Sequence, residues 1–328
     1  MEQAYSSSGS VALKAEGLKK YFPVHRGFFQ RLSGWVKSVD GVDLEILRGK
    51  TLGLVGESGC GKSTVARLIL KLLECDDGRI IYQGCDISGF SEKDMKPLRK
   101  EMQIVFQDPF SSLNPRMTIG QTIEEGLRSS GLPGGVRKGR VGELLEMVGI
   151  AGSAADRYPH EFSGGQRQRI GIARALSVEP SLIVCDEPVS ALDVSIQAQI
   201  INLLKDLQVQ LGLSYLFIAH DLNVVGYISD AVAVMYLGHI MEYAGAEELY
   251  DNPLHPYTLA LFSSIPSTEP QDRHERKALA GDVPSPFNPP PGCKFQGRCP
   301  LVEERCRKEE IGFRPAKDDH LVRCWKVG

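Results

Sequence analysis

Residues 56–64 read GESGCGKST and combine residue types that can hold the phosphates of a nucleotide. Glycine at three of these positions lets the backbone turn its N–H groups inward around an anion, and a helix beginning near Lys62 would add its positive dipole end. The Lys62 ammonium would neutralise terminal phosphates, and the Ser63 hydroxyl can ligate Mg²⁺. A glycine-rich turn that merely joins a strand to a helix is the alternative, but the full spacing after an apolar run makes it rare. The predicted phosphate loop comprises Gly56, Glu57, Ser58, Gly59, Cys60, Gly61, Lys62, Ser63 and Thr64.

Two acidic residues, Asp186 and Glu187, directly follow the apolar run SLIVC. At the end of a buried strand, Asp186 would hold Mg²⁺ directly or through water, while Glu187 is positioned to polarise an attacking water. Acidic residues at strand ends are common, so the pair alone is a weak signal. Its place downstream of a phosphate loop, after an insertion of this size, makes it a strong one. We therefore expect Glu187 to be the principal catalytic residue.

Three apolar runs must position these side chains: TLGLVG before the phosphate loop, SLIVC before Asp186, and SYLFIAH, which ends at His220. Continuous apolar runs of this length, separated by helical stretches, are typical of buried strands in a mostly parallel sheet. Open α/β sheets bind ligands at the carboxyl ends of their strands, where these runs carry their polar residues. We therefore predict an α/β fold. Between Gln107 and Asp186 the sequence is typical of turns and amphipathic helices, so we expect a helical insertion there.

Composition and charge argue against several classes of function. The 328 residues are 42% apolar, enough for a large core, and the net charge of −3 provides no basic surface for tracking nucleic acid. No apolar run approaches the roughly 18 residues that would span a bilayer, and the first ten residues lack the order of a signal peptide. We therefore expect a cytosolic protein, in which the eight cysteines are poor candidates for structural disulfides.

The stretch FSGGQRQR, residues 162–169, places a serine and two glycines before a helical pattern, where they would offer a hydroxyl and N–H groups to an anion. A helix cap without a ligand is the alternative for this stretch alone. The stretch resembles the signature sequence of the ATP-binding cassette (ABC) family, which usually opens with Leu where this chain has Phe162. That resemblance implies that the signature meets ATP held by the phosphate loop of a second subunit. The residues implied in this contact are Ser163, Gly164, Gly165 and Gln166, with Asp193 of SALD in the loop that crosses the dimer interface.

Three further positions match the family residue by residue. Gln107 in IVFQDP resembles the glutamine that reaches Mg²⁺ and the attacking water and senses the membrane partner. His220 in IAHD resembles the switch histidine that contacts the γ-phosphate, although a histidine after an apolar strand is otherwise more often a core or strand-end residue. Phe22 in LKKYFPV matches the aromatic residue that stacks on adenine, with Tyr21 as the adjacent rival. The resemblance thus implies Glu187, His220, Gln107 and Lys62 as catalytic residues, and Ser63, Gln107 and Asp186 as Mg²⁺ ligands.

The resemblance covers residues from about 11 to 265 and implies the fold of a P-loop NTPase. The implied form is the ABC nucleotide-binding domain, a RecA-like core with an antiparallel β subdomain and an inserted α-helical subdomain. We expect this domain at residues 1–265, with the helical subdomain at about 108–180. The following stretch is rich in proline and charge, which is typical of a linker. Residues 266–328 are therefore expected to form a proline-rich linker and a small C-terminal extension with four cysteines.

Stretches outside the nucleotide motifs narrow the resemblance. FQDPFSSLNPRMTIGQTIEEGL, RYPHEFSGGQRQR and NPLHPYTLALFSSIP are similar to ATPase subunits of bacterial oligopeptide and dipeptide permeases, a group that also includes nickel importers. The resemblance implies an ATPase that drives uptake of di- or oligopeptides, with nickel or another small solute as the alternative cargo. It also implies ATP and Mg²⁺ as cofactors, and a peripheral location on the cytoplasmic face of the bacterial inner membrane. The implied partners are an identical or paralogous ATPase subunit, two transmembrane permease subunits and an extracytoplasmic solute-binding protein, with no nucleic acid.

The C-terminal tail holds Cys293, Cys299, Cys306 and Cys324. Four thiols in a short tail of a cytosolic protein indicate a metal or cluster site more than disulfides. Their spacings are wider than the paired spacing of a zinc ribbon and match none of the common ferredoxin patterns. Peptide-permease ATPases share this cysteine tail, and a [4Fe–4S] cluster is implied for some of them. The resemblance therefore implies such a cluster in this chain. Zinc, or reduced thiols in a small packed appendage, are the alternatives.

Two rival functions use the same cassette. A nucleic-acid repair ATPase would tend to carry a long coiled-coil insertion, and a translation factor would tend to carry two cassettes, and the sequence has neither pattern. A redox-sensing regulator would use the cysteines to control ATP hydrolysis. Equal ATPase rates after replacement of the tail cysteines would count against that third class.

Overall fold

The computed structural model describes residues 10–27, 31–108, 112–263, 284–317 and 319–327. The described residues divide into two compact units: unit 1 contains those within 10–47, 51–89 and 219–327, and unit 2 contains those within 48–50 and 90–218. Residues 266–283 of the predicted linker lie outside the described ranges. Within those ranges, no helix has the length and apolar character needed to cross a membrane.

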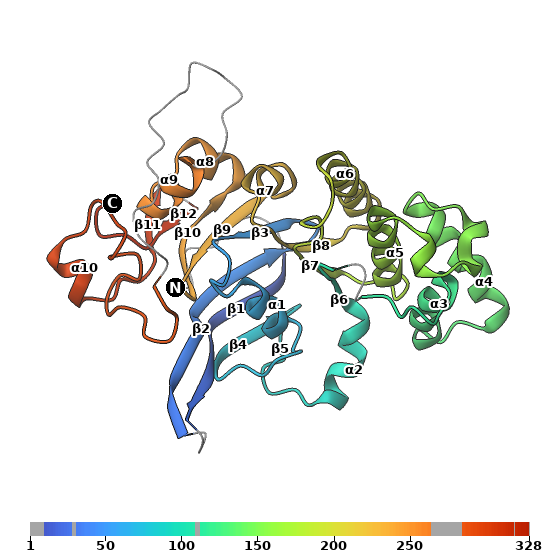
Figure 1. Ribbon diagram of the computed structural model, residues 1–328, viewed down its shortest axis with the longest axis horizontal. Helices are drawn as coiled ribbons and strands as arrows, with labels where there is room; N and C mark the ends of the chain where they lie inside the picture. Colours follow the sequence, from blue (N-terminus) through green and yellow to red (C-terminus); the bar gives the residue numbers. More distant parts are fainter. Residues whose placement is uncertain (1–9, 28–30, 109–111, 264–283, 318, 328) are drawn as a thin grey trace. The chain divides into compact units, whose positions relative to one another are not determined.

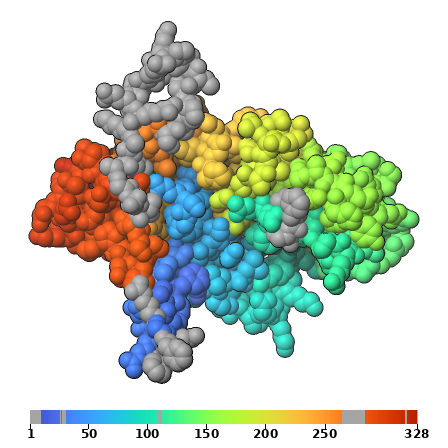
Figure 2. Space-filling model, viewed as in Figure 1, coloured from blue at the N-terminus to red at the C-terminus, as the bar shows by residue number. Residues whose placement is uncertain are grey.

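Unit 1 contains an antiparallel sheet with the strand order β2 (Arg31–Leu47), β1 (Val11–Arg26), β4 (Asp77–Tyr82) and β5 (Cys85–Asp86). β1 and β2 form a long hairpin, whose pairing runs from Val11 opposite Leu47 to Arg26 opposite Arg31. β4 pairs with β1 from Leu13 to Lys19. The part of the hairpin beyond this pairing, dark blue in Figures 1 and 2, projects past β4 and β5.

A second set of strands in unit 1 joins the segment before the phosphate loop to the C-terminal extension, which we define as the described residues from 284 to 327. These strands follow the order β11 (Arg314–Lys317), β12 (His320–Val322), β10 (His239–Gly245), β9 (Ala231–Tyr236) and β3 (Thr51–Val55). β3 and β9 are parallel, whereas β9, β10, β12 and β11 pair antiparallel. The extension thus adds β12 beside β10, and β11 beside β12 (Figure 1), which the sequence of the tail did not predict. The helices of unit 1 in the described ranges are α1 (Lys62–Ile69), α7 (Leu222–Ile228), α8 (Ala246–Asp251), α9 (Pro256–Ser263) and α10 (Glu304–Lys308).

Unit 2 contains the parallel strands β8 (Ser214–Ile218), β7 (Leu182–Asp186) and β6 (Met102–Val105), in that order. Every residue of β7 and β8 is buried, because parallel strands are covered on both faces. This explains their continuous apolar sequences and confirms the predicted α/β class. Helix α2 (Glu92–Glu101) precedes β6, and α6 (Val194–Leu211) follows β7. Between β6 and β7 the chain forms α3 (Ile119–Ser129), α4 (Gly134–Met147), the 3₁₀ helices η1 (Gly152–Asp156) and η2 (Pro159–Glu161), and α5 (Gly164–Leu176).

Candidate nucleotide-binding site

The predicted phosphate loop lies between β3 and α1 in unit 1, and its glycines are required by its geometry. Gly56, Gly59 and Gly61 have φ angles of 153°, 79° and 114°, in the region that favours glycine. A Cβ on Gly56 would lie 2.1 Å from the carbonyl oxygen of Met235, and one on Gly61 would lie 2.2 Å from that of Ser38. Helix α1 begins at Lys62, and its N-cap Gly61 has no side chain to cap the first turn. No N-cap side chain therefore competes with an anion for the N–H groups of that turn.

The Lys62 side chain is buried over the loop. Its ammonium donates to the carbonyl oxygens of Gly56, at 2.8 Å, and Glu57, at 3.0 Å. The Thr64 hydroxyl lies 2.8 Å from that of Ser38 and so ties the first turn of α1 to β2. Burial raises the pKa of the Cys60 thiol, so this loop cysteine stays neutral. The loop therefore presents a fixed cation without a competing thiolate.

The two candidate adenine-stacking residues have different surroundings in the hairpin. The Tyr21 hydroxyl donates to Asp40, and the Lys37 ammonium lies 5.2 Å from the centroid of the Tyr21 ring. Burial and then the hydrogen bond to Asp40 raise the pKa of Tyr21. The Phe22 side chain is 38% exposed, with the Lys20 ammonium 5.9 Å from its ring centroid. The engaged hydroxyl of Tyr21 and the exposed ring of Phe22 favour Phe22 for stacking.

The two acidic residues lie at the carboxyl end of β7 in unit 2. Asp186 is the last residue of the strand and is buried, in register with Ile218 of β8. Glu187 has a φ of 50°, a left-handed conformation that costs a residue with a side chain about 1–3 kcal/mol. Its N–H donates to the carbonyl oxygen of Ile218 at 2.9 Å, which holds this turn. The Gln107 amide donates to the Glu187 carboxylate at 2.9 Å, so two predicted catalytic side chains meet.

The predicted signature forms the N-terminus of α5 in unit 2. The Ser163 hydroxyl accepts from the Gln166 N–H at 3.4 Å, while the Gln166 side chain accepts from the Ser163 N–H at 3.0 Å, which makes a capping box. A Cβ on Gly165 would lie 2.4 Å from the Ile196 side chain of α6, so this turn packs tightly. Gly164 is the first residue of α5, and Asp193 is the N-cap of α6. The helix-cap alternative thus describes the local geometry, and the contact with a second subunit stays a prediction.

His220 is the second residue after the end of β8 and belongs to unit 1. Its side chain is exposed, whereas Ile218 and Ala219 before it are buried. Asp221 caps α7 by accepting from the N–H of Asn223 at 2.9 Å and that of Val224 at 3.4 Å. The histidine is therefore a surface residue on a fixed turn rather than a core residue.

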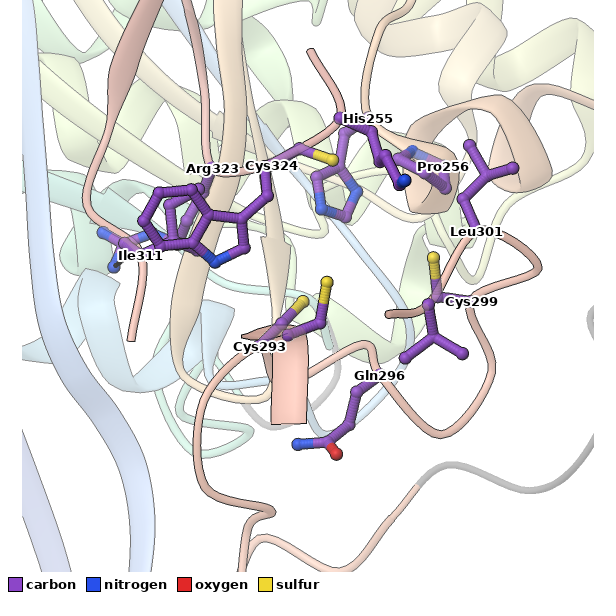
Figure 3. Close-up of a pocket in the computed structure, with 13 residues that line it drawn as sticks. His255, Pro256, Cys293, Gln296, Cys299, Leu301, Ile311, Arg323 and Cys324 are labelled. Carbon is purple, nitrogen blue, oxygen red and sulfur yellow. Dashed lines mark hydrogen bonds between the residues drawn. The ribbon is translucent and has the colours of Figure 1, made fainter. Parts of the chain in front are cut away.

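The four tail cysteines line one cavity in the C-terminal extension. The sulfur atoms of Cys293, Cys299 and Cys324 face the same space in Figure 3, and Cys306 also lines it. All four are free thiols, and the N–H of Cys293 donates to the carbonyl oxygen of Cys306 at 2.8 Å. Burial, and next the neighbouring thiols, raise the pKa of Cys293 to about 11. In the described part of the chain, no three His, Cys, Asp or Glu side chains are placed as a metal-holding group.

Comparison with known proteins assigns the family. The family model "ABC transporter" matches residues 39–190, and the model "Oligopeptide/dipeptide transporter, C-terminal region" matches residues 241–306. The oligopeptide transport ATP-binding protein AppF of Bacillus subtilis is 54% identical over 97% of this chain and 98% of its own length. This chain belongs to the ABC transporter family. It is therefore an ATPase of the ABC class, which works with ATP and Mg²⁺.

Two further matches support the ABC assignment. The oligopeptide transport ATP-binding protein OppF of Salmonella typhimurium is 50% identical over 97% of this chain and 96% of its own length. The ATP-binding cassette MJ0796, solved as a dimer in a post-hydrolysis state with ADP and Pi, has a TM-score of 0.62 and 26% identity. That match covers 71% of this chain and 98% of the solved chain. The predicted fold of an ABC nucleotide-binding domain is thus confirmed. These two matches do not test the predicted four-cysteine extension.

The one departure from the usual ABC signature is structurally mild. Phe162 is buried, as an apolar residue at the start of the signature should be, and the Arg157 guanidinium lies 4.6 Å from its ring centroid. Arg167 of α5 donates to the carbonyl oxygen of Pro159 at 2.7 Å and fixes the preceding turn. The larger aromatic side chain therefore leaves the cap geometry of this ABC subunit intact.

Sequence reasoning missed two residues that contact the phosphate loop. Tyr257 of α9 accepts a hydrogen bond from the N–H of Glu57 at 3.0 Å, and Arg298 of the extension pairs with the Glu57 carboxylate at 2.8 Å. Tyr257 lies in a stretch that indicated only the subfamily, and Arg298 lies beside Cys299 in the cysteine tail. These contacts join residues 200 and 241 positions apart, and no spacing pattern in one sequence signals such a contact.

Proposed function

We propose that this chain is the ATP-hydrolysing subunit of a bacterial importer of oligopeptides or dipeptides. The observation that carries the proposal is the near-complete alignment with AppF, 54% identical across 97% of this chain. The match of residues 241–306 to an oligopeptide/dipeptide transporter region supports peptides rather than nickel as the cargo, and import rather than a nucleic-acid role. In this proposal residues 1–265 are the nucleotide-binding domain, with its helical subdomain at about 108–180, and residues 266–328 are the linker and extension.

The catalytic roles follow the chemistry of the side chains. Lys62 neutralises the terminal phosphates, and Ser63, Gln107 and Asp186 would each serve as a ligand of Mg²⁺. Glu187 accepts the proton of the attacking water. Gln107 orients that water together with Glu187, which the hydrogen bond between their side chains supports. The exposed side chain of His220 contacts the γ-phosphate as a switch residue.

The second half of each ATP site comes from another ATPase subunit, either a copy of this chain or a paralogue. The two glycines at the N-terminus of α5 support this role, because the N–H groups of the first residues of a helix have no acceptor within the helix and these two residues have no side chain to cover theirs. MJ0796 supports it as well, since that ATP-binding cassette was solved as a dimer with ADP and Pi. The signature residues of this chain would then bind the nucleotide held by the partner.

A groove in unit 2 supports docking of a membrane subunit. It has a volume of about 1000 Å³ and lies among α2, β6, α3 and α5. Phe106, which is 41% exposed and directly precedes Gln107, lines it together with Ile104 and several basic side chains. A cytoplasmic segment of a permease subunit with an apolar residue and acidic neighbours would fit these groups. This chain would thereby sit peripherally on the cytoplasmic face of the inner membrane, with the solute-binding protein on the other side.

The proposal predicts which proteins copurify with this chain. When the tagged chain is purified from bacterial membranes in mild detergent, we expect two membrane-spanning permease subunits and a second ATPase subunit in stoichiometric amounts. The measurement is mass spectrometry of the intact complex. Recovery of this chain without membrane subunits, or with a nucleic-acid-bound partner, would contradict the importer function.

We propose as a second, separate function that the four tail cysteines hold a [4Fe–4S] cluster. Support comes from four free thiols on one cavity, because four cysteine thiolates are the usual ligands of such clusters. The raised pKa of Cys293 is consistent with thiols that lose their protons only when a metal binds. The described geometry contains no ready metal-holding group, so binding would draw the thiols together. The cluster would be structural and would cross-link the extension.

Anaerobic purification followed by iron and sulfide analysis tests the cluster. We expect about four iron and four sulfide per chain, with a brown colour. Cys299→Ser should lose most of this iron, while Cys85→Ser, an exposed cysteine outside the cavity, should keep it. A colourless protein without iron, or one with a single zinc ion, would show that the proposed cluster is wrong.

A further inference from the structure

Arg298 connects the C-terminal extension to the phosphate loop. One guanidinium nitrogen, Nη1, donates to both carboxylate oxygens of Glu57, at 2.8 and 3.1 Å, and Nη2 donates to Oε1 at 3.1 Å. The side chain of Arg298 is 7% exposed and that of Glu57 22% exposed, so water screens this pair only in part. Such forked contacts between arginine and carboxylate fix the relative orientation as well as the distance.

The guanidinium rests on a buried aromatic cluster made of Tyr236, Tyr257 and Phe295. Ring centroids in this cluster are 4.7 to 5.4 Å apart, and the Arg298 guanidinium carbon lies 6.0 Å from the centroid of Tyr236. Tyr257 also holds the backbone of Glu57 through the N–H hydrogen bond at 3.0 Å. Arg298 thus binds the carboxylate of Glu57 and Tyr257 binds its backbone N–H, although both residues are distant from Glu57 in sequence.

Glu57 occupies a sensitive position in the loop. Its carbonyl oxygen accepts from the Lys62 ammonium at 3.0 Å and from the Cys60 N–H at 3.3 Å, so its peptide group orients the phosphate-binding lysine. Its carboxylate adds a negative charge to a loop that binds the negatively charged phosphates of ATP. At short range and partial burial, such a charge would repel polyphosphate unless a cation neutralised it. Arg298 supplies that cation.

We propose that Arg298 is a positioning residue for the phosphate loop, acting through Glu57. It neutralises the Glu57 carboxylate and holds the loop backbone in the form that binds phosphate. ATP affinity thereby depends on the turn of the extension between Cys293 and Cys299, in which the Arg298 N–H donates to the carbonyl oxygen of Phe295 at 3.0 Å. The inference rests on the binding of ATP by the phosphate loop.

The extension has other anchors, so the Arg298 contact can be removed without releasing it. β12 pairs with β10, and the buried His320 and Glu242 side chains are hydrogen-bonded at 2.8 Å. Arg323 donates to the carbonyl oxygen of Ile240 at 3.0 Å. A substitution at Arg298 is therefore expected to change the loop and leave the extension folded.

The test measures binding of the non-hydrolysable ATP analogue AMP-PNP, with Mg²⁺, to the purified full-length chain by calorimetry. Arg298→Ala should weaken binding by about tenfold or more, because it leaves the Glu57 charge unpaired beside the phosphates. The double variant Glu57→Gln/Arg298→Ala should bind more tightly than Arg298→Ala alone, since it lacks that charge. Arg314→Ala, an exposed arginine of the same extension, should bind like the wild type.

Two results would overturn the inference: Arg298→Ala binding within about twofold of the wild type, or no recovery in the double variant. The recovery separates an effect through Glu57 from a general loss of structure. If Arg298→Ala does not fold, the same comparison uses Arg298→Met, which keeps most of the side-chain volume and removes both the charge and the forked contact. Failure of the wild type to bind AMP-PNP would instead refute the function of the phosphate loop itself.

Discussion

Glu187→Gln is expected to keep ATP binding close to the wild-type affinity and to lower ATP hydrolysis by a factor of about 10²–10⁴, the usual contribution of a general base. The amide has the same size and can still accept the hydrogen bond from Gln107, but it cannot take a proton from water. The backbone turn at Glu187 depends on its N–H bond to Ile218, which the substitution keeps. The measurement is phosphate release by the assembled complex, alongside nucleotide binding by the same preparation.

Glu179→Gln is the matched control for this experiment. Glu179 is also a carboxylate of unit 2 with a left-handed φ, of 56°, but its side chain is exposed and pairs with Arg140. Its substitution should leave phosphate release unchanged. Hydrolysis by Glu187→Gln at a rate near that of the wild type would show that another group activates the water.

Lys62→Ala is expected to weaken ATP binding by about 10- to 100-fold, because one charged hydrogen-bond donor to phosphate is typically worth about 1.5–3 kcal/mol. Lys62 is buried over the loop and already bonded to two loop carbonyls, so its position is fixed before any phosphate arrives. The expected loss of hydrolysis follows from the loss of binding. Titration of the purified chain with ATP and Mg²⁺ measures the affinity directly.

The control for Lys62→Ala is Lys308→Ala, because Lys308 is an exposed lysine on α10 that pairs with Glu304. It should bind ATP like the wild type. The thermal unfolding temperature of both variants shows whether the loop has lost its fold as well as its cation. If Lys62→Ala bound ATP with the affinity of the wild type, the assignment of this loop as the phosphate-binding part of the nucleotide site would be wrong.

Local patterns predicted much of the fold and of the candidate site. The apolar runs identified β3, β7 and β8, because strands covered on both faces have continuous apolar sequences. The glycines of the phosphate loop were predictable for a related reason, since their spacing reflects backbone angles that few other residues adopt. In each case the cause and its sequence signal lie within a few residues of each other.

Contacts between distant segments were beyond the reach of one sequence. The tail was expected to be a linker with a cysteine appendage, yet it adds β12 to β10, which is some eighty residues away. The pairing of Arg298 with Glu57 crosses 241 positions and depends on an aromatic cluster drawn from β9, α9 and the extension. The cysteines were found by residue type, but their common cavity depends on how the extension folds.

The most direct test of the central claim is the ATPase rate of the membrane complex that copurifies with this chain, with and without peptide-loaded binding protein. The importer function predicts that peptides of two or more residues stimulate ATP hydrolysis severalfold, and that a complex with Glu187→Gln shows no stimulation. Stimulation by nickel but not by peptides, or by nucleic acid, would contradict the proposed peptide import.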